Sequence, residues 1–147
     1  AYLISESLHL LGQSPVGTRR DKIKRLVDHS LSHGWDPVNG GFFDMGRYDG
    51  GEVVIIARSK SWWAQAEGLN ALHMMAMLYP DDPLDYASYY ERMWRHIDRY
   101  LLDHTHGGWY PKSTDTSPEA KKADKAGLWK GNYHTARSLI NCIWRRE

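Results

Sequence analysis

The stretch SWWAQAEGLNALHMMAMLY, residues 61–79, is apolar on most of the surface of the helix that it predicts. A helix at a protein surface has a single apolar stripe, whereas a helix that is apolar all round is normally buried. The methionines at 74, 75 and 77 are expected to fill gaps in the core. Residues 60–79 are therefore predicted to form a central helix that other elements must cover.

The segments on either side predict the covering elements. Residues 18–33 form an amphipathic helix with Thr18 as its N-cap and Gly34 at its end. A second amphipathic helix is predicted over 83–103. Two further helices are predicted over 1–11 and 131–145, and the extended runs around YDGG predict a β-hairpin within 41–58.

An internal repeat with an offset of 67 residues orders these elements. The offset relates Gly40-Gly41 to Gly107-Gly108, Phe42-Phe43 to Trp109-Tyr110, Trp62 to Trp129, Gln65 to Asn132 and Glu67 to His134. Each unit has a Gly-Gly-aromatic loop, an apolar helix and an amphipathic helix, and such units bury their faces on stacked neighbours. We therefore expect residues 1–147 to be one all-α unit, truncated to the last five helices of a twelve-helix toroid, with short β-hairpin loops.

The composition favours a sugar ligand and argues against several other partners. Seven Trp and nine Tyr against two Phe suit partly wet clefts and flat polar ligands, because these rings have a polar tip. A net charge of +1 without a basic stripe argues against nucleic acid, and the apolar run ALHMMAMLY is too short to cross a membrane. With one cysteine, Cys142, and no signal peptide, we expect a cytoplasmic location.

The segments KSWWAQAEGLNAL (60–72) and KAGLWKGNYHTARSLI (125–140), with the loops GGFFD and GGWY, resemble the N-acylglucosamine 2-epimerase and cellobiose 2-epimerase family. The resemblance covers nearly the whole chain in the same order. It implies an (α/α)6 barrel, of which this chain holds the C-terminal part. It also implies inversion at C2 of an aldose, or aldose–ketose interconversion, through a cis-enediolate. Two histidines would do this chemistry, with no metal and no other cofactor.

The resemblance gives the role of the C-terminal catalytic histidine to His134. The family's other histidine lies in a GH-x-x-E segment just before the helix within which this chain begins, and that segment is absent here. The resemblance therefore implies that half of the acid/base pair is missing. We expect the 147-residue chain to be inactive alone.

The residues around His134 suit this chemistry physically. A neutral imidazole can act as acid or base near neutral pH, and a helix N-terminus keeps it neutral. Trp129 offers a flat face for a sugar ring, and Trp63 and Glu67 share one helix face. The remaining candidates for substrate binding are Trp62, a quarter-turn away, and Gln65, which could bond a sugar hydroxyl.

Each of these assignments has a structural alternative. His134 could bond a loop carbonyl, and one of the two adjacent tryptophans is expected to pack between helices. Glu67 could form a buried ion pair with Arg58, Lys60 or Lys130, and Arg137 is expected to be structural. The spacing of His104 and His106 would suit a metal, but no Cys or carboxylate cluster completes a site, so a loop role is favoured.

Three function classes remain open from the sequence. The favoured one is a 2-epimerase or isomerase acting on a mono- or disaccharide with a glucose- or mannose-type reducing end. The second is a carbohydrate-binding or glycoside-hydrolase-like toroid, which needs two carboxylates across the scissile bond. The third is a non-catalytic interaction module. Exposed inner helices would form an apolar patch, which predicts self-association or a partner such as the missing N-terminal half of the barrel.

Overall fold

A computed structural model describes residues 1–14, 16–113, 118 and 120–145 of the chain. Its helices are α1 (Tyr2–Leu10), α2 (Thr18–Gly34), α3 (Trp62–Leu78), α4 (Tyr86–His96) and α5 (Tyr133–Trp144). A π-helical turn, Ile97–Leu101, extends α4, and a 3-10 turn spans Ala120–Lys122. The strands β1 (Met45–Asp49) and β2 (Glu52–Ala57) form an antiparallel hairpin. The five predicted helices and the hairpin are confirmed.

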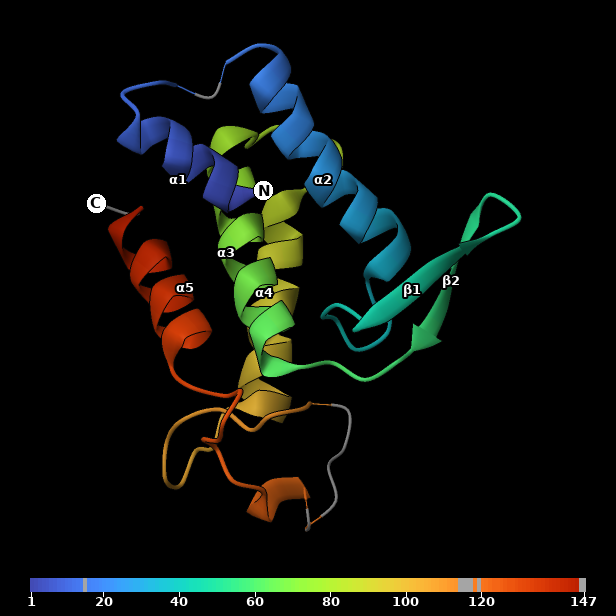
Figure 1. The fold of residues 1–147 in the computed structure, drawn as a ribbon, viewed down its shortest axis with the longest axis vertical. Coiled ribbons are helices and arrows are strands. Elements are labelled where there is room, and N and C mark those ends of the chain that lie inside the picture. Colours follow the sequence, from blue (N-terminus) through green and yellow to red (C-terminus); the bar gives the residue numbers. More distant parts are fainter. Residues whose placement is uncertain (15, 114–117, 119, 146–147) are drawn as a thin grey trace.

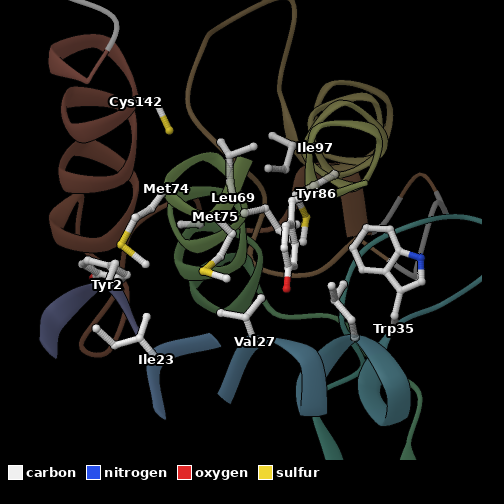
Figure 2. Close-up of a cluster of buried hydrophobic side chains, with 14 of the residues drawn as sticks. Tyr2, Ile23, Val27, Trp35, Leu69, Met74, Met75, Tyr86, Ile97 and Cys142 are labelled. Atoms are coloured by element: carbon white, nitrogen blue, oxygen red, sulfur yellow. The ribbon is translucent and has the colours of Figure 1, made fainter. Parts of the chain in front are cut away.

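Helix α3 lies at the centre of the described structure, as its composition predicts. In Figure 1, α4 runs beside it, α5 flanks it on one side and α2 on the other. The side chains that meet around α3 in Figure 2 are Ile23 and Val27 from α2, Leu69, Met74 and Met75 from α3, Tyr86 from α4 and Cys142 from α5. The central position follows from removing apolar surface from water, which contributes about 25 cal/mol per Å².

Two details of the helices differ from the sequence predictions. Gly17, not Thr18, is the N-cap of α2, and no side chain caps this end, because the helix already includes Thr18. Met77 is 52% exposed and so does not fill the core, whereas Met74 and Met75 do. None of the helices in the described part of the chain is long and apolar enough to cross a bilayer.

The hairpin projects from the helical body (Figure 1). Asp49 pairs with Glu52, and the turn residues Gly50 and Gly51 have φ values of 59° and 92°. A two-residue turn with positive φ at both positions matches the twist of the flanking strands and is easy for glycine. Tyr48 Oη lies 3.3 Å from Nε2 of His29, which ties the hairpin to α2.

The Gly-Gly loop after α2 is held by one aspartate. Oδ1 of Asp36 accepts hydrogen bonds from two backbone N–H groups of the loop, those of Val38 and Asn39, at 2.9 and 3.2 Å. Oδ2 accepts from Lys60 Nζ at 2.7 Å, and the same ammonium donates to the carbonyl of Gly40 at 2.5 Å. Lys60 is 1% exposed, so this ion pair is inside the protein.

The loop after α4 repeats this arrangement, with its aspartate and glycine 67 residues later and its lysine 65 residues later. Asp103 accepts from the backbone of Thr105 and His106 at 2.9 and 3.1 Å. Nζ of Lys125 donates to Asp103 at 2.6 Å and to the carbonyl of Gly107 at 2.7 Å. The repeat seen in the sequence is thus also a repeat of individual hydrogen bonds.

Candidate active site

The candidate site lies where α3 and α5 begin. These helices run in the same direction, and their N-terminal ends lie at the same end of the fold (Figure 1). His134 is the second residue of α5, and Glu67 is in the second turn of α3. His134 Nδ1 lies 2.6 Å from Glu67 Oε1, so the two side chains that the repeat relates are in direct contact.

Glu67 receives two further hydrogen bonds. Arg137 donates from one guanidinium nitrogen to Oε1 at 2.5 Å, and the hydroxyl of Tyr2 donates to Oε2. Burial raises the pKa of the Glu67 carboxyl, but the hydrogen bonds from Tyr2, His134 and Arg137 outweigh this effect and leave it below its ordinary value. Glu67 is therefore ionised at neutral pH.

The ionised carboxylate selects the tautomer of His134. A carboxylate can only accept hydrogen bonds, so the proton between the two groups belongs to Nδ1. In the neutral ring, Nε2 then carries a lone pair that can take a proton. The His134 side chain is 33% exposed, which leaves its ring accessible to a ligand.

Two exposed aromatic rings lie beside His134. The ring centroid of Trp63 lies 6.0 Å from that of His134, and Tyr133 meets the imidazole edge-on at 5.0 Å. Trp63 is 46% exposed, and Trp129, in the turn ahead of α5, is 87% exposed. Exposed tryptophan and tyrosine faces are suited to stacking against a sugar ring. Tyr133 was not among the site residues predicted from the sequence, although its place next to His134 in the first turn was a signal.

Two of the residues predicted to bind substrate contact the protein's own loops and core instead. Gln65 is fully buried, and its amide accepts from the N–H of Phe42 at 2.8 Å and donates to the Phe42 carbonyl at 3.0 Å. The expected bond from Gln65 to a sugar hydroxyl is therefore wrong, because this side chain holds the Gly-Gly loop against α3. Trp62 is partly buried against the core beneath Lys130, so of the two tryptophans it is the one that packs between elements.

The structural alternative for Glu67, an ion pair with one of three nearby cations, named the wrong partners. Lys60 bonds Asp36, and Lys130 donates to the carbonyl of Lys125 at 2.6 Å. Arg58 lies over the ring of Phe43. Glu67 pairs with Arg137 instead, because α5 packs against that face of α3.

A cavity of about 570 Å³ opens beside the site. Tyr2, Trp63 and Glu67 line one part of it, and the hairpin lines another. Pockets of about 300–1,000 Å³ typically bind small organic molecules. A sugar-sized ligand would meet both an aromatic ring and a carboxylate here.

The described residues contain no group of three or more His, Cys, Asp or Glu side chains that could hold a metal ion. His104 Nε2 bonds the carbonyl of Asp98 at 2.8 Å, and His106 lies 3.6 Å from Asp103. These two histidines thus belong to the loop after α4.

Comparison with known proteins agrees with these features. The family model for N-acylglucosamine 2-epimerase (GlcNAc 2-epimerase) matches residues 8–138. The cellobiose 2-epimerase of Bacteroides fragilis is 24% identical over 143 residues, which are 97% of this chain and 35% of that protein.

Two solved structures share the fold. A D-mannose isomerase matches with a TM-score of 0.77 and 24% identity, over 97% of this chain and 35% of its own. The cellobiose 2-epimerase from Spirochaeta thermophila matches with a TM-score of 0.69 and 25% identity, over 98% of this chain and 35% of its own. The chain thus spans about a third of the length of these relatives.

This chain has the fold of the C-terminal part of an (α/α)6 barrel. Its alternating helices, its repeated loops and the structural matches all agree on this class. The chain belongs to the N-acylglucosamine 2-epimerase family, whose model matches most of its length.

Proposed function

We propose that this chain carries one side of the active site of a sugar 2-epimerase or aldose–ketose isomerase, with His134 as the base. The substrate is a mono- or disaccharide with a glucose- or mannose-type reducing end. The observation that carries the proposal is the 2.6 Å hydrogen bond between His134 Nδ1 and Glu67 Oε1.

The proposed step is removal of the proton at C2. His134 Nε2 takes this proton, the electron pair of the C2–H bond forms a C1=C2 double bond, and the carbonyl oxygen at C1 takes the negative charge. The product is a cis-enediolate. Return of a proton to C2 from the opposite face, with the C1 carbonyl formed again, gives the epimer. Return of a proton to C1, with the O2 proton moving to O1 so that C2 becomes the carbonyl carbon, gives the ketose.

Two features of the site favour this step. The Glu67 carboxylate offsets the positive charge that the imidazole gains when it takes the proton. The first turn of α5 presents the positive end of a helix dipole, which stabilises a developing enediolate oxygen nearby.

The site is a poorer fit to glycoside hydrolysis. That reaction needs a carboxylic acid with a raised pKa and a second carboxylate across the bond. The Glu67 carboxyl has a lowered pKa, and both of its oxygens accept hydrogen bonds from Tyr2, His134 and Arg137. The repeat places His134, not a second acid, opposite it.

The substrate assignment rests on the family resemblance of KAGLWKGNYHTARSLI (125–140), the segment that contains Trp129, and on the relatives' names. Those relatives include cellobiose 2-epimerases and a D-mannose isomerase. A ring stacked on Trp63, whose centroid lies 6.0 Å from that of His134, would bring a reducing end close to His134, and we propose Trp129 as a second stacking surface.

The test is exchange of the C2 hydrogen in deuterated water with glucose, mannose and cellobiose. The 147-residue chain is assayed alone and fused behind the preceding part of the Bacteroides fragilis cellobiose 2-epimerase, in place of that protein's matching C-terminal third. We expect exchange by the fusion and none by the chain alone, because the opposite-face histidine of the GH-x-x-E segment comes only with the fusion.

A fusion that folds and binds sugar without exchanging C2 hydrogen would contradict the proposal and favour a carbohydrate-binding role. Exchange by the chain alone would show that the second histidine is not required.

A further inference from the structure

The Glu67 carboxylate, on α3, accepts hydrogen bonds from three side chains on two other helices. Tyr2 on α1 donates to Oε2, and His134 and Arg137 on α5 share Oε1 at 2.6 and 2.5 Å. Tyr2 and Arg137 are thus two donors to this carboxylate in addition to His134. Because they bond different oxygens, they fix the plane of the carboxylate.

Arg137 is itself held in place by aromatic rings. Its guanidinium carbon lies 4.2 Å from the ring centroid of Tyr133 and 5.4 Å from that of Tyr2. It also donates to the hydroxyl of Tyr133. A planar guanidinium that stacks on a ring and bonds a carboxylate keeps one orientation, which a lysine ammonium at that position would not.

Tyr2 is 3% exposed, so its hydroxyl is buried with the carboxylate as its partner. Removing this hydroxyl would leave Oε2 without its donor in a partly buried site. The carboxylate could then turn toward water, and the hydrogen bond to His134 would lengthen or be lost. Nothing in the sequence analysis gave Tyr2 a role.

We propose that Tyr2 and Arg137 are positioning residues that orient Glu67 so that His134 keeps its proton on Nδ1 and presents the Nε2 lone pair to a substrate. This inference rests on the proposed function for its catalytic meaning. The arrangement of protons that it describes can be measured without any substrate.

The experiment is nitrogen NMR of the chain labelled with ¹⁵N-histidine at neutral pH. Long-range proton–nitrogen spectra distinguish a protonated ring nitrogen from one with a lone pair, and the His134 signals are those missing from His134→Asn. We expect the Nδ1–H tautomer in the unchanged chain. Tyr2→Phe should lower the ratio of Nδ1–H to Nε2–H about fivefold, the factor for one ordinary hydrogen bond.

Tyr86→Phe is the matched control. The Tyr86 hydroxyl is also buried and also donates to a carboxylate, that of Asp28, but it joins α4 to α2 away from His134. Tyr86→Phe removes a hydrogen bond of the same kind, from a tyrosine hydroxyl to a carboxylate, and should leave the His134 tautomer unchanged. Equal tautomer ratios in Tyr2→Phe and the unchanged chain would overturn the proposal.

Arg137→Lys and Arg137→Met extend the test. Lysine keeps the charge and should partly preserve the tautomer, whereas methionine keeps only the stem and should shift the ratio as Tyr2→Phe does. An unshifted ratio in Arg137→Met also overturns the proposal.

The unchanged chain provides a measurement if the variants fail to fold. The hydroxyl proton of Tyr2 should exchange slowly with water and show a nuclear Overhauser effect to Arg137. A rapidly exchanging Tyr2 hydroxyl would contradict the proposal. Failure of the epimerase proposal would appear instead as absent C2 exchange with an intact Nδ1–H tautomer.

Discussion

At the scale of single residues, the contact between Glu67 and His134 decides the chemistry of the site. An imidazole alone has two tautomers, and only the one with its proton on Nδ1 leaves Nε2 free to act as a base. Glu67 is ionised and 2.6 Å away, so it selects that tautomer. In the proposed step it would also stabilise the imidazolium that forms when His134 takes the proton.

Glu67→Gln therefore tests the carboxylate directly. A glutamine amide can donate to Nδ1, which would reverse the tautomer, and it cannot offset a positive charge. In the fusion described above, we expect the rate of C2 exchange to fall by about 10²-fold or more. Glu6→Gln is the control, because Glu6 also bonds α5, through Arg145 at 3.2 Å. A Glu67→Gln rate equal to that of Glu6→Gln would show that the carboxylate is not needed.

The site residues differ in how far sequence could predict them. His134 was chosen through the family resemblance and Glu67 through its matching position in the repeat, and the structure brings the two side chains into contact. Gln65 was misassigned, because helical spacing gives the face of a residue but not which neighbouring loop covers it. Tyr2 was missed since its contact joins positions 65 residues apart.

At the scale of elements, the two Gly-Gly loops are fixed against the helices by buried polar side chains. Gly41 has a φ of 80°, and a Cβ there would lie 2.7 Å from Oε1 of Gln65. His96 links the two loops: its Nδ1 lies 2.9 Å from the Asn39 carbonyl and its Nε2 lies 2.8 Å from Ser113 Oγ. Sequence predicted the loops by their repeated glycines but gave no sign of the histidine between them.

The two repeated ion pairs differ in burial, and this gives a paired prediction. Lys60→Met leaves Asp36 charged and buried without its partner, which typically costs about 3–5 kcal/mol of stability. Lys125→Met removes the equivalent contact from a more exposed lysine, with 28% of its side chain accessible against 1% for Lys60. We expect urea unfolding to show a clearly larger loss for Lys60→Met. Equal losses would mean that burial does not distinguish the pairs.

His96 predicts how stability depends on pH. Burial, helped by the nearby Lys60 charge, lowers the pKa of His96 from 6.5 to about 4. Between these values the unfolded chain binds more protons than the folded one, so stability falls as the pH drops from 6.5 to 4. The total loss from this group is about 3 kcal/mol.

Urea unfolding of the unchanged chain and of His96→Gln, at several pH values between 4 and 7, measures this contribution. The stability of His96→Gln should depend less steeply on pH within that window. Parallel curves would assign the acid sensitivity to other groups.

At the scale of the whole molecule, the described helices bury one face of the array and expose apolar side chains on another. The sequence predicted the inner and outer helices from their apolar patterns, and α3 is buried accordingly. Helix α5 is less covered than its inner role implied, with Ile143 60% and Trp144 69% exposed. An apolar pattern predicts that a helix face will be covered, but it does not show whether the covering element belongs to the same 147 residues.

These exposed side chains lead us to expect self-association of the 147-residue chain. Contiguous exposed apolar surface commonly marks an interface. Analytical ultracentrifugation should give a mass above the 17.0 kDa of one chain, which Ile143→Glu with Trp144→Glu should return toward the monomer. A monomer at every concentration tested would contradict this expectation.

The central claim is that His134 is the base and Trp129 part of the binding surface, and C2 exchange by the fusion tests it most directly. We expect His134→Asn to lower exchange by about 10²–10⁴-fold, the usual contribution of one acid–base group, while sugar binding measured by calorimetry is largely retained. Trp129→Ala should do the reverse, weakening binding more than it slows turnover of bound sugar. Exchange that continues undiminished in His134→Asn would contradict the account and assign the base to another residue.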